Sequence, residues 1–303
     1  MDIAITGSGG LIGTALTKAL TDRGDRVLSL TRSTEKAKND PDSAYWSPTD
    51  GSIDAAALEG MDAVIHLAGE PIAAKRWTDV QKTKLLDSRT EGTTLIAETL
   101  AGLDRPPATL LSASAIGYYG ETGQQLVDET APAGSDFLAN ICVAWEASTA
   151  AAEAAEIRTV HLRTGIVQST EGGALQKQLL PFKMGLGGKV LPGTQWISWI
   201  SIDDEVGAIV HALDTPEVTG AVNLVAPNPV TNADYASTLG KVLHRPTFII
   251  PLIGPKVLVG SELAESLLKT STRVDAGVLE RTGYRFAHTD LEAALRSVID
   301  GDR

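Results

Sequence analysis

Short apolar runs alternate with longer amphipathic segments through the first half of the chain. Five of these runs predict strands: Ile3–Thr6, Val27–Thr31, Ala63–Ala68, Thr109–Ser112 and Thr159–Leu162. Between the first two, apolar residues recur at helical spacing from Leu11 to Leu20, and Gly24 follows where a helix C-terminus favours glycine. The segment Glu146–Glu156 is rich in Ala and Glu, which predicts a further helix. Strands and helices that alternate in this way are typical of a parallel sheet built from βαβ units.

The alternation breaks beyond about residue 165. Glycines cluster between residues 185 and 193, and Ala221–Val225 resembles one more strand that returns to the sheet. We therefore expect an α/β fold with a Rossmann-type, doubly wound parallel sheet in residues 1–170, completed by the returning strand. Residues 171–303 should form a smaller C-terminal substrate lobe, with the site at the strand ends between the two parts.

Composition mainly excludes classes of function. The 303 residues include 26 Lys and Arg against 38 Asp and Glu, a formal net charge of −12, which disfavours binding to nucleic acid or an anionic membrane. Cys142 is the only cysteine, so the sequence predicts no internal disulfide and no Cys-based zinc site, and no other metal-ligand spacing occurs. No apolar run approaches the length of about 18 residues expected of a membrane span, and the N-terminus does not resemble a secretion signal. The sequence predicts a cytoplasmic protein.

The first predicted strand runs directly into a glycine-rich turn that opens the first helix. Gly7, Gly10 and Gly13 give the spacing G-x-x-G-x-x-G. Such a turn lets the backbone approach a pyrophosphate and lets the helix pack closely on the strand, although glycine-rich turns also occur without a ligand. Its place in a βαβ unit favours a dinucleotide site. The expected contacts are Gly7, Ser8, Gly9, Gly10, Leu11, Ile12 and Gly13.

The end of the second strand selects the cofactor. It carries Arg32 and Ser33. An acidic residue at this place binds the ribose 2′-hydroxyl of NAD(H), whereas an arginine accommodates the 2′-phosphate of NADP(H). Glu35 is the alternative, a ribose-binding acid three residues further on, and Arg32 would then be a solvated surface charge. Arg32 favours NADP(H).

From here the sequence resembles the extended and atypical short-chain dehydrogenase/reductases. Asp62–Gly69 resembles the family's fourth strand, Leu110–Gly120 its fifth strand with the active-site serine, and Leu162–Val167 the segment past the nicotinamide. Ser198–Asp204 and Gly220–Leu224 resemble later blocks of nucleotide-sugar epimerases. The chain is similar above all to a subgroup of epimerase family proteins, through Glu70–Trp77, Ser88, Arg89, Asp136–Leu138, Trp145, Glu146 and Leu263–Leu295.

The resemblance implies an NADP(H)-dependent oxidoreductase or epimerase that acts on a sugar nucleotide or another carbonyl or hydroxyl substrate. The further cofactor contacts that it implies are Leu67, Ala68, Gly69, Glu70, Arg89, Ser112, Ala113, Arg163 and Thr164. Arg89 falls on the inward stripe of a helix, where related enzymes have Asn, and a buried charge needs a partner. That partner is an anionic cofactor or substrate group or a structural ion pair, unless the side chain reaches solvent.

One departure from the family pattern concerns the reaction itself. The family's Tyr-x-x-x-Lys pair falls on Leu138 and Cys142, which cannot move a proton as that pair does, and Cys142 is interpreted as a buried apolar residue. Ser114 matches the family serine, with capping of the strand end as the alternative. Tyr118 or Tyr119 could donate a proton as a neutral phenol, with aromatic packing as the alternative. A catalytically silent NADP(H)-binding sensor or scaffold is therefore the second hypothesis.

Other polar features have structural interpretations. Thr78 and Gln81 resemble a capping box at a helix start, and Asp203–Glu205 resembles the acidic first turn of another helix. His66 and His161 lie within apolar strands and are interpreted as histidines that are hydrogen-bonded in the core or that hold residues of the site in place. A charged cluster past one strand end forms either a ligand-facing or a solvated loop: Glu70, Lys75, Arg76 and Trp77. The expected partner is a small-molecule substrate, and a homodimer stays open.

Overall fold

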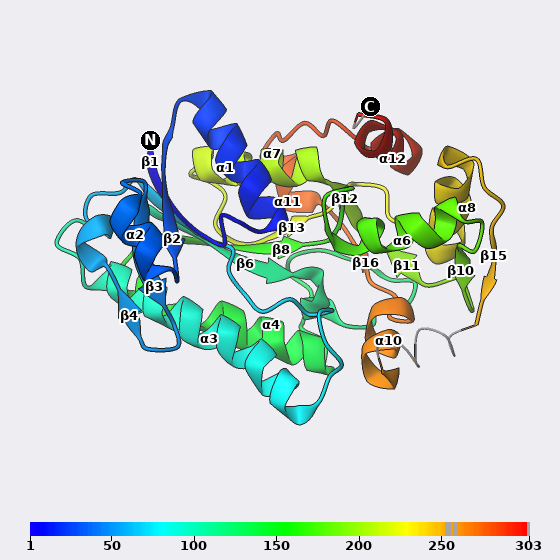
Figure 1. Ribbon diagram of the computed structural model, residues 1–303, viewed down its shortest axis with the longest axis horizontal. Coiled ribbons are helices and arrows are strands. Elements are labelled where there is room, and N and C mark those ends of the chain that lie inside the picture. Colours follow the sequence, from blue (N-terminus) through cyan, green and yellow to red (C-terminus); the bar gives the residue numbers. More distant parts are fainter. Residues whose placement is uncertain (252–255, 257–259, 302–303) are drawn as a thin grey trace.

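The computed structural model describes residues 1–251, 256 and 260–301. Its centre is an eight-stranded sheet in the order β13-β8-β6-β5-β1-β2-β3-β4 (Figure 1). The strands are β1 (Asp2–Thr6), β2 (Arg26–Thr31), β3 (Ser43–Ser47), β4 (Ser52–Ile53), β5 (Ala63–His66), β6 (Thr109–Ala115), β8 (Arg158–Thr164) and β13 (Gly220–Leu224). All neighbours are parallel except β3 and β4. Because the sheet grows outward in both directions from β1, it is the doubly wound Rossmann sheet that the sequence predicts.

Helices cover both faces of this sheet (Figure 1). One face carries α1 (Leu11–Arg23) and α7 (Ile202–Asp214), and the other carries α3 (Asp79–Ala101), α4 (Phe137–Ala147) and α5 (Ala150–Ala154). Leu16 and Ile209 are fully buried on the first face, as are Ile96 and Leu100 on the second. A parallel sheet that is apolar on both faces needs helices on both, and the burial pattern meets that need.

The C-terminal lobe consists of short paired strands and helices. The pairs are β9 (Ile166–Gln168) with β12 (Trp199–Ser201), β10 (Gly188–Val190) with β15 (Phe248–Ile250), β11 (Trp196–Ile197) with β14 (Val230–Thr231), and β16 (Arg273–Val274) with β7 (Leu126–Val127). The helices are α6 (Gly173–Lys183), α8 (Asn232–Val242), α10 (Ser261–Leu268), α11 (Gly277–Arg281) and α12 (Leu291–Asp300). Trp199 is fully buried in the lobe's own core beside Leu175 and Leu239. Among the helices of the described residues, none has the length and apolar character of a membrane span.

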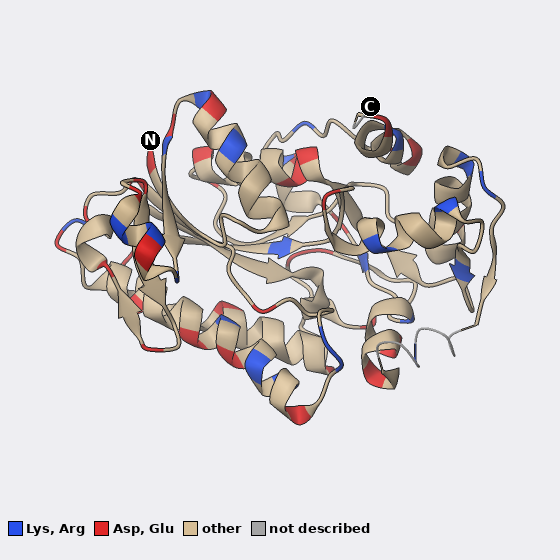
Figure 2. Cartoon of the chain, in the orientation of Figure 1, with Lys and Arg blue, Asp and Glu red and all other residues tan. Residues whose placement is uncertain are grey.

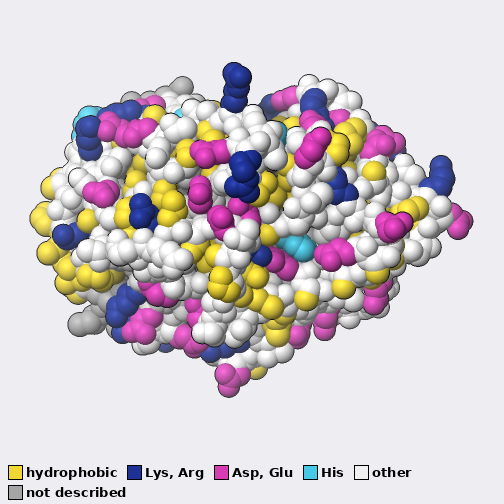
Figure 3. Space-filling model, turned by 180° about the vertical axis from the view of Figure 1, so that it is seen from behind, with side chains coloured by type: hydrophobic (Ala, Val, Ile, Leu, Met, Phe, Trp, Pro, Cys, Tyr) yellow, Lys and Arg dark blue, Asp and Glu magenta, His cyan; other side chains and the backbone are white. Residues whose placement is uncertain are grey.

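The surface of the lobe differs from that of the rest of the molecule. Acidic side chains occur on helices on both faces of the sheet (Figure 2). Exposed apolar side chains gather at the end of the lobe that carries β10 and β15, where Leu186, Phe248 and Ile249 are each more than half exposed (Figure 3). Arg245 lies at the same end and donates to the carbonyl of Lys183. This end of the lobe therefore presents apolar side chains to solvent.

The structure confirms the predicted strands, with ends shifted by one to three residues, and Ala221–Val225 returns as β13 beside β8. The single helix predicted at Glu146–Glu156 is wrong. Two helices form instead, because the hydroxyls of Ser148 and Thr149 donate to the carbonyls of Ala144 and Glu146 and the chain turns there. The boundary at residue 170 stays a prediction, since α7 lies in the second part of the chain but packs on the sheet.

The first turn of α7 is acidic, as predicted, but two of its carboxyl groups are fully buried. Asp204 accepts hydrogen bonds from the N–H groups of Ala287 at 2.7 Å and His288 at 2.9 Å, which anchors the segment before α12. Glu205 accepts one hydrogen bond, from the Thr164 hydroxyl at 2.8 Å, and its Oε2 has no partner among the described residues. Burial raises the pKa of Glu205 to about 8, so this carboxyl is protonated at neutral pH.

Glu205→Gln should therefore stabilise the protein increasingly as the pH rises. A glutamate in the unfolded chain ionises near pH 4.5, whereas Glu205 in the folded chain keeps its proton to about pH 8. The wild type consequently loses stability as the pH rises through this interval. Glutamine keeps the acceptor for Thr164 and does not titrate. Between pH 5 and pH 8 the difference in free energy of unfolding should shift toward the variant by roughly 3 kcal/mol.

Urea unfolding at the two pH values measures this shift. Asp203→Asn is the matched control, because it changes an exposed carboxylate of the same helical turn, and its stability relative to wild type should show no such trend. A constant difference between Glu205→Gln and wild type at both pH values would contradict the raised pKa.

Candidate functional site

The glycine turn between β1 and α1 contains two glycines that the fold requires. Gly7 has a φ of +71°, which side chains other than glycine rarely adopt. A Cβ on Gly13 would overlap the Gly7 carbonyl oxygen and lie 2.8 Å from its carbon. By contrast, a Cβ on Gly9 would meet nothing within 4 Å, and one on Gly10 would meet only the Gly7 oxygen at 3.2 Å. Gly9 and Gly10 thus leave open space that the protein does not fill.

This space lies in front of the first turn of α1. Gly10 is the N-cap residue and offers no side-chain oxygen to the turn, and the turn contains no acidic residue. By contrast, α4 is capped by Asp136, whose carboxylate accepts from the Ala139 N–H at 2.9 Å. The N–H groups and the positive end of the helix dipole of α1 are therefore available to an anion.

Thr6 joins the glycine turn to the loop after β5. Its hydroxyl oxygen accepts from the N–H groups of Leu67 at 3.1 Å and Ala68 at 3.2 Å, so its own proton goes to Nδ1 of His66 at 2.7 Å. Burial lowers the pKa of His66 to about 4, and the ring is neutral. His66 therefore supports the loop, although its Nε2 has no partner among the described residues.

Arg32 and Ser33 lie past the end of β2, next to the glycine turn, because β2 pairs with β1 up to Thr6 and Leu30. Arg32 is exposed and has no ion-pair partner among the described residues. Ser33 caps α2 (Thr34–Asn39) and accepts from the Lys36 N–H at 3.1 Å. Glu35 is exposed in the first turn of the same helix. Both the arginine and the acid are therefore exposed just past the end of β2.

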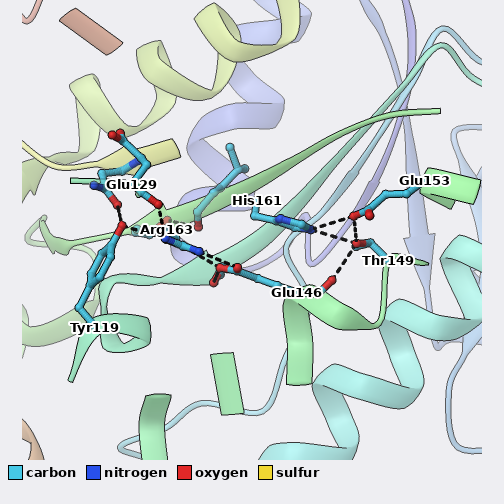
Figure 4. A network of polar contacts seen from close by, with 11 residues as sticks. Tyr119, Glu129, Glu146, Thr149, Glu153, His161 and Arg163 are labelled. Atoms are coloured by element: carbon cyan, nitrogen blue, oxygen red, sulfur yellow. Dashed lines mark hydrogen bonds and ion pairs between the residues drawn. The ribbon is translucent and has the colours of Figure 1, made fainter. Parts of the chain in front are cut away.

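The ends of β6 and β8 carry a network of polar side chains (Figure 4). Ser114 donates to Oε1 of Glu146 at 2.7 Å, and Arg163 binds the same carboxylate through Nε at 2.8 Å and Nη2 at 2.9 Å. All three side chains are largely withdrawn from solvent. Burial would raise the pKa of Glu146, but the hydrogen bonds from Arg163 and Ser114 outweigh it and hold the pKa below its ordinary value. Glu146 is thus a carboxylate that bonds directly to Ser114.

The same network separates the two candidate tyrosines. The Tyr119 hydroxyl donates to Oδ1 of Asn223 at 2.6 Å and accepts from Nη1 of Arg163 at 2.9 Å, and burial raises its pKa to about 12. This position favours the packing alternative for Tyr119. The Tyr118 ring stacks on the Arg163 guanidinium, with 3.5 Å from Cζ to the ring centroid, and the residue is half-buried. Tyr118 is thus the more accessible of the two candidate tyrosines.

Other residues that the sequence analysis singles out lie in β6 and β8 or in the adjacent α4. Ser112 is fully buried, and Thr164 donates to Glu205 and is only partly exposed. Ala113 is half-buried. Cys142 is buried in α4 and burial raises its pKa to about 12, so its thiol is inert as a nucleophile at neutral pH. Nε2 of His161 lies 2.9 Å from the hydroxyl oxygen of Thr149, so this histidine supports the residue that precedes α5.

The loop after β5 is tied to α3. Thr78 caps α3 and accepts from the Gln81 N–H at 3.2 Å, as predicted, but the Gln81 side chain reaches Glu70 at 3.4 Å and not back to Thr78. The reciprocal half of the predicted capping box is therefore wrong, because the Thr78 N–H, which would donate to the Gln81 side chain, donates instead to the carbonyl of Arg76 at 3.1 Å. Lys75 and Arg76 are exposed, whereas the Trp77 ring packs edge-on against Phe137.

Arg89 of α3 is 7% exposed. Its Nη1 donates to the carbonyls of Glu70 and Leu85, both at 3.0 Å, and its Cζ lies 4.8 Å from the centroid of the Trp145 ring. Among the described residues no carboxylate forms an ion pair with it. The structural ion pair that the sequence left open is therefore absent from the described part of the chain.

A sequence model of the NAD dependent epimerase/dehydratase family matches residues 3–225. The chain belongs to this family. A domain of unknown function, DUF1731, matches residues 250–298. Epimerase family protein SDR39U1 of Homo sapiens is 35% identical over 99% of this chain and 100% of its own length. An epimerase family protein of Mycobacterium bovis is 41% identical over 97% of this chain and 96% of its own length.

Solved structures place this epimerase-family chain among nucleotide-binding relatives. Human SDR39U1, solved with NADPH, superposes with a TM-score of 0.89 at 32% identity and covers 99% of each chain. A nucleoside-diphosphate sugar epimerase from Corynebacterium glutamicum gives a TM-score of 0.81 at 35% identity, over 99% of this chain and 58% of that one. The chain thus has an NAD(P)-binding fold related to nucleotide-sugar epimerases.

Sequence reasoning on this epimerase-family chain missed Glu146, Asn223 and Glu129 as parts of the site. Glu146 binds Ser114 and Arg163, Asn223 binds Tyr119, and the Glu129 carbonyl accepts from Arg163 at 3.3 Å. The one available signal was Glu146 directly after Trp145 within the family resemblance. The other two join the network only through the folding of distant segments.

The two kinds of glycine should respond differently to substitution. Gly13→Ala should lower the free energy of unfolding by about 1–3 kcal/mol, because its Cβ must displace the Gly7 carbonyl. Gly9→Ala should change it by much less, because its Cβ enters open space. Chemical denaturation of the two variants and the wild type measures the difference. Equal loss of stability in both would show that the turn is packed differently from the structure.

Proposed function

We propose that this chain binds NADP(H) across the ends of β2, β1 and β5 and acts as an epimerase-like oxidoreductase on a sugar nucleotide or another carbonyl or hydroxyl compound. The observation that carries the proposal is the open space over Gly9 and Gly10, in front of a helix N-terminus without a side-chain cap. A ligand phosphate fits such a place well. The relative SDR39U1, solved with NADPH, supports NADP(H) as the cofactor.

The residues present fit such a cofactor from one end to the other. The backbone of Gly9 to Ile12 would hold the pyrophosphate, and Arg32 with Ser33 would hold the 2′-phosphate at the end of β2. The nicotinamide half would then lie toward β5 and β6, where Ser114 is placed. There the cofactor would supply or accept a hydride.

The proton that accompanies hydride transfer needs a residue of this chain. Ser114 already donates its proton to Glu146, so its oxygen is free to accept from a substrate hydroxyl. As the substrate hydroxyl gives its proton to the Ser114 oxygen, the Ser114 proton passes to Oε1 of Glu146. Carbonyl reduction uses the Tyr118 phenol as donor, because Arg163 and Ser114 hold Glu146 as a carboxylate that has no proton to return. Arg163 keeps Glu146 in the geometry that the relay from Ser114 requires.

A catalytically silent NADP(H)-binding sensor or scaffold is the second candidate. It is favoured by Leu138 and the buried Cys142 at the positions of the family's Tyr and Lys. NADPH oxidation over a panel of sugar nucleotides and simple carbonyl compounds separates the two candidates. Turnover supports the oxidoreductase, and tight NADPH binding without turnover across the panel supports the sensor.

Arg32 should determine the choice of cofactor. Only NADP(H) carries the 2′-phosphate, and a hydrogen bond to a charged group contributes about 1.5–3 kcal/mol. Arg32→Ala should therefore weaken NADPH roughly 10- to 150-fold and barely change NADH. Arg32→Glu should invert the preference, since a carboxylate repels the phosphate and accepts from the ribose hydroxyls. Isothermal titration with both cofactors measures these affinities.

Gly10→Val tests whether the glycine turn binds the pyrophosphate of the cofactor. It should abolish binding of both cofactors while unfolding remains close to that of wild type. If wild-type protein binds NADH as tightly as NADPH, Glu35 or another loop residue reads the ribose and Arg32 is only a surface charge. If Gly10→Val binds NADPH normally, the glycine turn is not the phosphate site.

Where turnover is found, Ser114→Ala should lower kcat/KM by about 100-fold, because the proton path to Glu146 is cut. Cys142→Ala is the control and should change kcat/KM little, since the buried thiol takes no part. Steady-state NADPH oxidation measures both variants. A large loss in Cys142→Ala together with normal activity in Ser114→Ala would show that the proton path is assigned to the wrong group.

A further inference from the structure

Exposed apolar side chains concentrate at one end of the C-terminal lobe (Figure 3). Six large ones lie there: Leu180, Met184, Leu186, Leu191, Phe248 and Ile249. We call this surface the lobe end; it comprises residues 180–191 and 244–249. The exposed fractions run from 51% for Leu191 to 66% for Leu180, so these side chains project into solvent. Apolar exposure that is concentrated in this way marks an interaction surface.

Contacts between the segments hold the lobe end together as one surface. Nε of Arg245 donates to the carbonyl of Lys183 at 2.8 Å, which ties the chain before β15 to the last turn of α6. The Phe248 N–H donates to the Gly187 carbonyl at 3.0 Å, and β10 pairs with β15 directly beyond it. In Figure 1, β10 and β15 lie at one extremity of the long axis of the molecule. The lobe end is therefore placed to meet a large surface without obstruction from the central sheet.

The charge of the lobe end is opposite to that of the whole chain. Residues 172–202 and 235–251, which contain it, include five Lys and Arg and no Asp or Glu, although the chain has a net charge of −12. Figure 2 shows basic and no acidic positions on β10 and between α8 and β15. Lys183 and Arg245 are exposed and Lys189 is half-buried, and within the described residues none of the three forms an ion pair with a carboxylate.

Acidic residues of the neighbouring helices α8 and α12 have partners of their own. Asp234 accepts from the Thr231 hydroxyl at 2.6 Å, and Glu292 accepts from Nζ of Lys241 at 2.6 Å. The cations of the lobe end therefore keep their charge beside the projecting apolar groups. This combination suits the interface of an anionic bilayer, where apolar side chains enter between headgroups and acyl chains while Lys and Arg bind lipid phosphates.

A second copy of the chain fits the lobe end less well. A two-fold axis through this surface would bring the cations of both copies into one interface, and juxtaposed like charges are unfavourable. Another protein would need cavities that match six projecting side chains. A lipid interface accepts projecting side chains in any arrangement, so the exposed fractions favour lipid.

We propose that the lobe end docks this protein peripherally on an anionic lipid surface. The proposal does not depend on the proposed function. The apolar side chains enter the headgroup region, and Lys183, Lys189 and Arg245 contact the lipid phosphates. The acidic remainder of the chain opposes this docking only weakly, because salt at physiological ionic strength screens charges beyond about 8 Å. The net charge thus disfavours adhesion of the chain as a whole but permits docking through this one end.

Flotation with lipid vesicles tests the proposal. The wild type should float with vesicles of phosphatidylcholine and phosphatidylglycerol, should not float with phosphatidylcholine alone, and should be released by high salt. Phe248→Ser should weaken binding about 10- to 100-fold, and Lys183→Gln about 5-fold. Val80→Ser and Lys38→Gln are the matched controls and should bind like the wild type, because these residues are exposed on α3 and α2.

Urea unfolding of the four variants should coincide with that of the wild type, since every substituted side chain is exposed. Equal binding of the wild type to both kinds of vesicle overturns the proposal, as does equal weakening in the lobe-end and control variants. Failure to bind the anionic vesicles also overturns it. In that case light scattering assigns the surface: a dimer that Phe248→Ser disrupts indicates a second copy, and a monomer indicates another protein as partner.

Discussion

The bidentate pair between Arg163 and Glu146 connects most parts of the candidate site. Arg163 belongs to β8 and Glu146 to α4, so the pair fixes a helix to the end of a strand. Ser114, Tyr119 and Tyr118 all contact one of its two members. A buried pair contributes little net stability, but removal of one partner costs about 3–5 kcal/mol because the other charge is left unpaired. Its main effect here is positional: it sets where the Ser114 hydroxyl points and holds the guanidinium against both tyrosines.

The glycine turn at the end of β1 depends on a different constraint, the close approach of backbone to backbone. Gly13 brings α1 against the Gly7 carbonyl, and Thr6 ties the same turn to the loop after β5. These contacts contain no charge and form no bond to a ligand. They hold Gly9 and Gly10 in front of the helix without anything above them. One end of the site is thus shaped by polar side chains and the other by the absence of side chains.

The sequence predicts well what depends on local pattern and poorly what depends on distant partners. Continuous apolar runs such as Ala63–Ala68 predict strands because these strands are buried on both faces. β3 was missed because Ser43–Ser47 mixes two serines with its apolar residues. The glycine turn is recognisable because its spacing is local. The role of Glu146 depends on Arg163, which lies 17 residues further along the chain, and Tyr118 and Tyr119 differ only in what the folded chain places beside each.

Three arginines of this chain show different ways to offset the desolvation of a cation. Arg158 distributes its donors over Thr109 and four carbonyls around the end of α7, where the negative end of the helix dipole lies. Arg163 is neutralised by a carboxylate. Arg89 has two carbonyl partners on a single nitrogen and an aromatic face. Because burial of a guanidinium is costly unless partners offset it, each of these arginines fixes the position of the groups around it: a helix end for Arg158, the Glu146 carboxylate for Arg163, and the loop after β5 for Arg89.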